Sequence, residues 1–262
     1  MMLTSPQNTR VKAAVRLRER RHRDREGLML VEGRDELTLA LDAGVRPVTL
    51  FATGEHAGSP LAERCAQLGA DVLEVTEEVF AKLAYREHPD GWVAVARIPE
   101  TTLERIEAWG RPLILVVDGV EKPGNLGAML RTADAAGATA VILSDAGTDP
   151  FNPNVVRASK GTVFSVPLAV ADANGVIEWL RERDIAIVVA TPESAALYSD
   201  ADLSGSVALV VGAEDTGVSG AWREAARVAV TIPMAGRVNS LNVATAAALL
   251  LYEAVRQRSA SR

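Results

Sequence analysis

Residues 232–258 constrain the fold more than any other part of the chain. A polar loop, IPMAGRVNSLN, runs directly into a helical stretch so rich in Ala and Leu that almost none of its faces is polar. Such a helix must be buried on most sides, either in a core or against a second subunit. Short polar side chains and free backbone N–H groups at the start of a buried helix form a small hydrogen-bonding site. We therefore expect a ligand site at this loop.

The length of 262 residues and a hydrophobic content of 48% allow one large domain or two small ones, each with a proper core. No apolar run approaches the roughly 20 residues of a membrane span, and the first residues lack the apolar core of a signal peptide. We expect a soluble protein of the cytoplasm with no membrane partner. A single cysteine, Cys65, and three scattered histidines, His22, His56 and His88, predict no metal site.

The charge is distributed unevenly along the chain. Residues 1–26 contain eight Lys or Arg and three acidic residues, a net charge of +5, so the remaining residues carry −11 of the total of −6. A basic arm on an acidic body suggests a polyanionic partner, although a solvated helix with salt-bridged faces is the alternative. Spacing predicts one helix over residues 11–25, ended by Gly27. Aromatic residues form only 4% of the chain, so stacking platforms for bases are not prominent.

The pattern of apolar runs predicts two α/β domains. Short strands and helices alternate over residues 28–98, which indicates a small α/β domain within residues 1–98. Residues 99–112 are bounded by prolines and rich in charge, so we interpret them as a linker with a short helix. The second domain, residues 113–262, opens with an apolar run typical of a parallel strand covered on both faces. Its repeated alternation predicts a parallel α/β sheet, with residues 145–162 as a polar loop.

Polar stretches follow three strands of this second domain. LILVVD is followed by GVEKPGNLGAMLRTADAAG, VALVVG by AEDTGVSG, and VTIPM by AGRVNSLN. Because parallel strands end at one edge of the sheet, we expect the three stretches to meet there. The glycines of the first stretch do not form G-x-G-x-x-G and there is no Walker lysine, which disfavours an NAD-binding oxidoreductase. In these stretches, Arg131 and Glu214 either take part in catalysis or form ordinary ion pairs within the domain.

The same stretches carry a family resemblance. GNLGAMLRTADAAG, LVVGAEDTG and IPMAGRVNSLNVATAAALLLYEA resemble, in order, the three motifs of the SpoU/TrmH family of S-adenosylmethionine-dependent RNA ribose 2′-O-methyltransferases. NPNVVRASKGTVFSVP is similar to the family segment between the first two motifs. The resemblance covers residues 113 to about 258. The N-terminal residues resemble, far less specifically, the substrate-binding domain often attached to family members.

The resemblance implies a deep C-terminal trefoil knot, a homodimer, and S-adenosylmethionine held by the knotted loops, with each active site completed across the dimer interface. It implies cofactor contacts, mainly through backbone groups, from Gly212, Ile232, Met234 and Leu241. It implies catalytic and substrate-positioning roles for Asn125, Arg131, Glu214, Ser240 and Asn242. Ala213 stands where many relatives have Asn, although some ribosomal-RNA members share the alanine.

The implied reaction is methyl transfer to a ribose 2′-hydroxyl of ribosomal RNA, with 23S RNA favoured. Transfer RNA is the alternative substrate, and a non-catalytic RNA-binding module is the alternative of another class. An arginine is a poor base because it has no acceptor, so we expect Arg131 to stabilise the developing alkoxide or to anchor the adjacent phosphate. Neither route needs a metal. The basic arm would then hold the RNA through Arg16, Arg18, Arg20 and Arg21.

Overall fold

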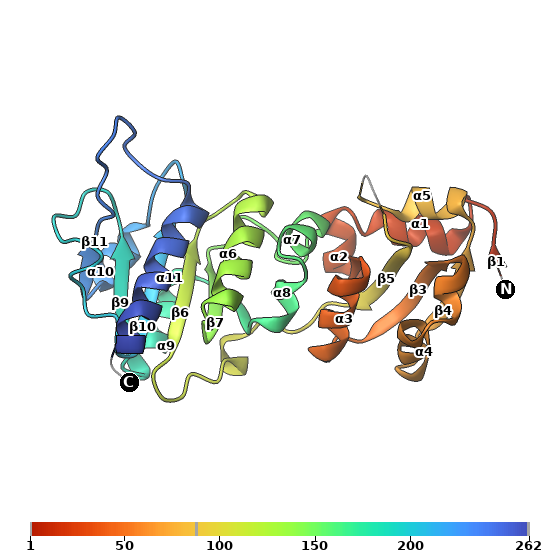
Figure 1. Ribbon diagram of the computed structural model, residues 1–262, viewed down its shortest axis with the longest axis horizontal. Coiled ribbons are helices and arrows are strands. Elements are labelled where there is room, and N and C mark those ends of the chain that lie inside the picture. The colour runs from red at the N-terminus through yellow and green to blue at the C-terminus, as the bar shows by residue number, and fades with distance from the viewer. Residues whose placement is uncertain (1, 87–88, 261–262) are drawn as a thin grey trace. The chain divides into compact units, whose positions relative to one another are not determined.

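The computed structural model describes residues 2–86 and 89–260 (Figure 1), so His88 lies outside the described residues. By its internal contacts the chain divides into two compact units. The first unit comprises Met1–Pro99 and Asp149–Ser165, and the second comprises Glu100–Thr148 and Val166–Arg262. The chain therefore passes between the units three times. The first passage falls at the start of the expected linker, whereas residues 149–165, which sequence analysis places in the second domain, pack with the first unit.

The first unit is built on a mixed sheet of five strands in the order β1-β4-β3-β5-β2. Strand β5 is antiparallel to β2 and β3, and the other described pairs are parallel. The strands are β1 (Met2–Leu3), β2 (Leu28–Glu32), β3 (Pro47–Thr53), β4 (Asp71–Val75) and β5 (Trp92–Arg97). Its helices include α1 (Thr9–Arg16), α2 (Arg20–Glu26), α3 (Arg34–Asp42), η1 (Gly54–Gly58), α4 (Pro60–Gln67) and α5 (Glu77–Leu83).

The basic arm forms two helices, α1 and α2, so the prediction of one continuous helix is wrong. The fully buried Arg23 donates to the carbonyl oxygens of Leu17 at 2.7 Å and Arg18 at 2.9 Å. In an uninterrupted helix these carbonyls would accept from backbone N–H groups four residues later. At the break between α1 and α2 they accept from the buried guanidinium instead. Gly27 ends α2 in the left-handed conformation, with φ 63°, as expected.

Residues 145–162 are not a simple loop, which corrects a second prediction. They contain α7 (Pro153–Ala158) and the start of α8 (Thr162–Ser165). The Asn152 side chain caps α7 by accepting from Asn154 N, and proline occupies the first helical turn. Helix α7 packs on β2, and α8 packs on α3. Both helices are too short to show a periodic apolar pattern, which explains why they were missed.

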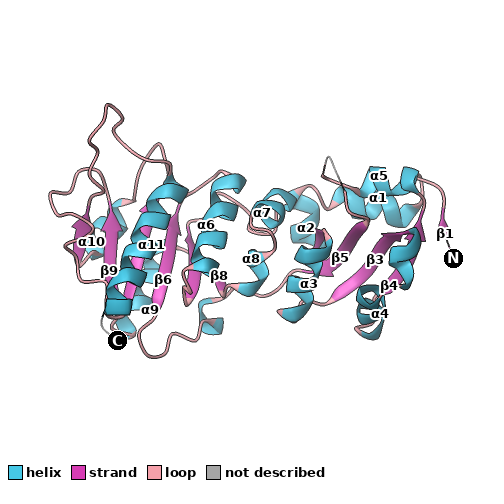
Figure 2. Ribbon diagram, viewed as in Figure 1, coloured by secondary structure: helices cyan, strands magenta, loops and turns pink. Residues whose placement is uncertain are grey.

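The second unit is a six-stranded sheet, parallel throughout, in the order β11-β9-β10-β6-β7-β8, which confirms the predicted parallel α/β class. Figure 2 shows α6 and α11 side by side on one face and α9 behind the sheet. The strands are β6 (Leu113–Asp118), β7 (Ala140–Ser144), β8 (Leu168–Ala171), β9 (Ala186–Ala190), β10 (Val207–Gly212) and β11 (Val228–Val230). The helices are η2 (Leu103–Arg105), α6 (Pro123–Ala135), α9 (Ala173–Glu182), α10 (Gly220–Ala225) and α11 (Val243–Ala260).

Helix α11 is buried on one face only, although its composition predicts burial on most sides. The face toward α6, β6 and β10 consists of Val243, Ala247, Leu250, Leu251 and Ala254. On the opposite face, Leu249 is 37% exposed and Tyr252 is 49% exposed, in line with the exposed Thr245 and Arg256. Among the described residues, Tyr198 lines a pocket together with Thr245, Leu249 and Tyr252, and the stripe stays partly open to solvent. Among the described residues, no helix combines the length and the apolar character that crossing a membrane requires.

Candidate active site

A pocket of about 620 Å³ lies at the carboxyl edge of the sheet in the second unit. This volume is in the range of roughly 300–1,000 Å³ that is typical of small-molecule sites. Its walls come from residues that end or follow β9, β10 and β11, so the second and third polar stretches meet as strand order predicts. All four predicted cofactor residues line it, together with two of the predicted catalytic residues: Gly212, Ile232, Met234, Leu241, Glu214 and Ser240.

Gly212 allows two backbone segments to approach closely at the wall of this pocket. A Cβ atom at this position would lie 2.2 Å from the carbonyl carbon of Gly217 and 2.3 Å from the nitrogen of Val218. Gly217 has φ +68°, and its N–H donates to Ala213 O at 2.9 Å, which closes a tight turn. Any side chain at residue 212 would force this turn away from the strand.

Glu214 joins residues from all three polar stretches. Its Oε1 accepts from Asn125 Nδ2 at 3.0 Å and from Asn242 Nδ2 at 2.8 Å. Asn242 Nδ2 also lies 3.1 Å from Asn125 Oδ1. The Lys122 ammonium donates to the other carboxylate oxygen, Oε2. We call Lys122, Asn125, Glu214 and Asn242 the Glu214 cluster.

The electrostatics of the cluster keep Glu214 charged. The hydrogen bond from Lys122, followed by that from Asn125, lowers the pKa of the Glu214 carboxyl, and the same bond to Glu214 raises the pKa of Lys122. A carboxylate that loses protons so readily is a poor general base at neutral pH. Glu214 is instead suited to orienting the two amides. Lys122 was missed by the sequence analysis, because a lysine in the loop before a helix carries no distinguishing pattern.

Asn242 links the cluster to the start of α11. Its Oδ1 accepts from Ala244 N at 3.0 Å, and its backbone oxygen accepts from Ala246 N at 3.0 Å. The carboxamide oxygen therefore serves the helix start, and the carboxamide nitrogen serves Glu214 and Asn125. The side chain is fixed at both ends. Ser240, two residues earlier, lines the pocket, and its hydroxyl bonds to no described residue.

Arg131 is not brought into the Glu214 cluster within this chain. It lies exposed on α6, outside the residues that line the pocket, and forms no hydrogen bond or ion pair with any described residue. Arg131 is six positions after Asn125, so at about 100° per residue the two side chains leave α6 on different faces. Its predicted role in the same site is therefore not explained by contacts within one chain.

A buried network supports the pocket from behind. Asp118, 4% exposed at the end of β6, accepts from the backbone N–H of Ser219 at 2.8 Å and from Ser144 Oγ at 3.2 Å. The indole N–H of Trp222 donates to the same Ser144 hydroxyl at 3.1 Å. These bonds tie the segment after Gly212 to the centre of the sheet. The sequence shows only an aspartate at a strand end, which is common at turns.

The four predicted RNA-binding arginines divide into two kinds. Arg18 is half-buried, and its guanidinium donates to the carbonyl oxygens of three residues at the end of α5: Lys82, Leu83 and Ala84. These three bonds all come from Nη2, and they give Arg18 a structural role in the first unit. Arg16, Arg20 and Arg21 are exposed, and the last two pair with the exposed acids Asp24 and Glu19. The alternative interpretation, a solvated helix with salt-bridged faces, therefore holds for part of the basic arm.

These features define a class of protein: a parallel α/β fold with a small-molecule pocket at the strand ends and a polar cluster beside it. The chain belongs to the SpoU rRNA Methylase family, whose model matches residues 112–252. Residues 8–94 match the MRM3-like substrate binding domain.

Similar proteins span nearly the whole chain. The chain is 35% identical to the 23S rRNA (uridine(2479)-2′-O)-methyltransferase of Streptomyces viridochromogenes, over 94% of this chain and 88% of that protein. It is 31% identical to the 23S rRNA (guanosine(2553)-2′-O)-methyltransferase RlmP of Bacillus subtilis, over 95% of this chain and 97% of that protein. The crystal structure of an AdoMet-bound rRNA methyltransferase from Sinorhizobium meliloti is 34% identical, with a TM-score of 0.91 over 98% of this chain and 97% of that one.

Proposed function

We propose that the protein transfers a methyl group from S-adenosylmethionine to a ribose 2′-hydroxyl of 23S ribosomal RNA. The observation that carries this proposal is the meeting of Asn125, Glu214 and Asn242, one from each polar stretch, beside the pocket. The names of the two similar proteins, both 23S rRNA 2′-O-methyltransferases, support the substrate. A ribosomal RNA substrate also supports the expected location in the cytoplasm.

The pocket fits S-adenosylmethionine, which supplies an electrophilic methyl group on a sulfonium when bound. Apolar walls from Ile232, Met234 and Leu241 suit the adenine ring, and the missing Cβ at Gly212 lets backbone groups approach closely. The AdoMet-bound structure from Sinorhizobium meliloti supports this choice of cofactor. Direct titration of the protein with S-adenosylmethionine would test it and would separate an enzyme from a non-catalytic RNA-binding module.

The residues of the chain must position the ribose and stabilise charge on its oxygen. Glu214, kept ionised by Lys122, holds the side chains of Asn125 and Asn242 in fixed positions beside the pocket. The 2′-hydroxyl must lose its proton as its oxygen attacks the methyl carbon, and negative charge develops on that oxygen as the proton leaves. Arg131 stabilises that charge, or anchors the adjacent phosphate so that a phosphate oxygen accepts the proton.

Arg131 acts from the second subunit of a homodimer in this proposal. The exposed apolar stripe of α11, with Leu249 and Tyr252, is a patch that a second copy can cover in an isologous interface. Helix α6, which carries Arg131, packs beside α11, so the same interface would present Arg131 to the partner. A mixture of Arg131→Ala and Glu214→Ala proteins should then recover activity that neither has alone. Tyr252→Arg should break the interface and give a monomer by light scattering. If the mixture recovers no activity and Tyr252→Arg is still dimeric, this arrangement is contradicted.

The knot expected from the family resemblance is also part of the proposal. The connection between β9 and β10 contacts both ends of the C-terminal segment. Tyr198 N donates to Thr231 O at 3.0 Å before the pocket loop, and Arg258 at the end of α11 donates to Gly205 O at 2.6 Å. A connection that touches both ends is the arrangement expected if the final segment threads through it. An experimental structure that traces residues 190–245 without a break would test this.

The N-terminal unit and basic arm are proposed to bind the RNA, which the match to a substrate binding domain supports. We assign no base to the nucleotide whose ribose is methylated, because the two similar proteins are named for uridine and guanosine. Methyl transfer from labelled cofactor should be measured on 23S RNA, 16S RNA and bulk transfer RNA. Label confined to 23S RNA is the expected result. Label confined to transfer RNA would support the alternative substrate.

A further inference from the structure

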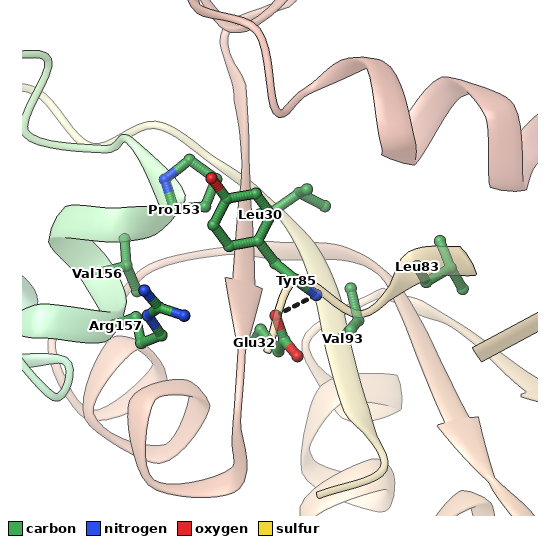
Figure 3. Close-up of a pocket in the computed structure, with 8 residues that line it drawn as sticks. All are labelled: Leu30, Glu32, Leu83, Tyr85, Val93, Pro153, Val156 and Arg157. Atoms are coloured by element: carbon green, nitrogen blue, oxygen red, sulfur yellow. Dashed lines mark hydrogen bonds between the residues drawn. The ribbon is translucent and has the colours of Figure 1, made fainter. Parts of the chain in front are cut away.

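Tyr85 is an exposed aromatic residue in a chain with few of them. Its side chain is 38% exposed in the first unit, just after α5. Figure 3 shows the ring beside Leu30 and Pro153, where these residues line a small cavity. The cavity holds about 10 Å³, which is room for no more than roughly one water molecule. The cavity is therefore too small for a ligand. The exposed part of the Tyr85 ring is the feature for which we seek a function.

Two guanidinium groups lie over the Tyr85 ring. The guanidinium carbon of Arg18 is 5.6 Å from the ring centroid, and that of Arg157 is 5.9 Å from it. Both distances are within the roughly 6 Å of a cation–π contact. Arg18 is already fixed by carbonyl groups at the end of α5. Arg157 is exposed in the last turn of α7, and its guanidinium makes one long hydrogen bond, 3.4 Å to Asn154 Oδ1, among the described residues.

The ring is held in position from both ends. The backbone N–H of Tyr85 donates to Glu32 Oε2 at 2.7 Å, drawn as the dashed line in Figure 3. The phenol oxygen accepts from Asn154 Nδ2 at 3.1 Å. A fixed ring loses little conformational freedom when a partner covers it.

We propose that Tyr85 and Arg157 form a stacking site for an unpaired base of the RNA substrate, an inference that rests on the proposed function. A tyrosine face and a planar guanidinium are the groups that bind splayed-out bases in single-stranded RNA. The exposed Lys160, three residues after Arg157, adds positive charge for the neighbouring phosphates. A paired base within a duplex could not reach the ring, so the site selects single-stranded segments.

The test compares Tyr85→Leu, Tyr85→Phe and Arg157→Gln for binding to a single-stranded RNA 12-mer and to a duplex of the same length. Tyr85→Leu should weaken single-strand binding about fivefold or more, the low end of what one stacked base contributes. Arg157→Gln should also weaken single-strand binding, and Tyr85→Phe should keep it within about twofold because the ring remains. Duplex binding should change less than single-strand binding in the Tyr85→Leu protein.

Arg183→Gln is the matched control, because Arg183 lies 4.4 Å over the ring of the buried Trp179 in the second unit. It removes a similar contact where no base can stack, so RNA binding should not change. Unchanged single-strand binding in Tyr85→Leu, with only a lower melting temperature, would overturn the inference. Equal weakening of single strand and duplex in Arg157→Gln, with no effect of Tyr85→Leu, would overturn it too. Wild-type protein that binds no RNA would instead defeat the proposed function.

Discussion

Asn242 donates to Glu214 at 2.8 Å, and this bond joins the loop before the final helix to the loop that follows β10. The same carboxylate accepts a hydrogen bond from Asn125, which lies in α6. One ionised side chain thus sets the relative positions of three loops that are distant in sequence. We infer that Glu214 supports the site by its negative charge, which holds Asn125 and Asn242 in place, and not by proton transfer.

Removal of Lys122 should move the acidic limb of the pH–rate profile. Lys122 and the two asparagines lower the pKa of Glu214 below its ordinary value of 4.5, so its carboxylate persists as the pH falls toward that lowered pKa. In Lys122→Met the pKa rises, and activity should be lost at a higher pH than in wild type. Single-turnover methyl transfer between pH 4 and 8 measures this. Lys82→Met, an exposed lysine of α5, is the control, and an acidic limb that stays in place would contradict the prediction.

Gly212→Ala should abolish cofactor binding and destabilise the second unit. The new Cβ would meet backbone atoms of residues 217 and 218 at 2.2–2.3 Å, and backbone cannot move aside as a flexible side chain can. Overpacking of this kind costs about 1–3 kcal/mol. Gly205→Ala is the control, because its Cβ would meet nothing within 4 Å. Calorimetric titration and thermal melts should show the difference, and normal cofactor affinity in Gly212→Ala would refute the close-approach argument.

Asp149→Ala should destabilise the first unit by about 3–5 kcal/mol, the usual effect of leaving a buried charge without its partner. Arg23 is 1% exposed, and its Nε donates to Asp149 Oδ2 at 2.7 Å. The exposed pair of Arg20 and Asp24 offers the comparison, since Asp24→Ala should cost at most about 1 kcal/mol. Chemical denaturation of both variants measures the two losses. Equal losses would show that the buried pair contributes no more than a surface pair.

Neutralising the exposed arginines of the basic arm should weaken RNA binding and reduce its dependence on salt. Replacing Arg16, Arg20 and Arg21 with Gln removes up to three phosphate contacts, and each contact contributes roughly 0.7–0.9 to the slope of log K against log salt. Arg105→Gln, an exposed arginine of the second unit, is the control. An unchanged slope in the triple variant would show that the arm does not bind phosphate.

The sequence was sufficient for the class of fold and for the place of the pocket, because parallel strands must end at one edge. Gly212, Glu214 and Asn242 follow strands in the sequence, but their roles were implied by the resemblance to the SpoU/TrmH motifs. The structure places Gly212 and Glu214 in the wall of one pocket and bonds Asn242 to Glu214. Lys122 and Asp118 could not be found this way, because their partners, Glu214 and Ser219, are distant in sequence. The structural role of Arg18 was hidden for the same reason: its carbonyl partners belong to another helix.

Methylation of a ribose 2′-hydroxyl in 23S RNA is the activity that we propose for this protein. The most direct measurement is incubation of the protein with 23S RNA and isotopically labelled S-adenosylmethionine, followed by complete digestion to nucleosides and mass spectrometry. We expect one labelled 2′-O-methylnucleoside. Glu214→Gln or Arg131→Ala should reduce the rate of labelling roughly a hundredfold, equivalent to about 2.7 kcal/mol. Label on a base instead of a ribose, or no label from a protein that binds the cofactor, would contradict it.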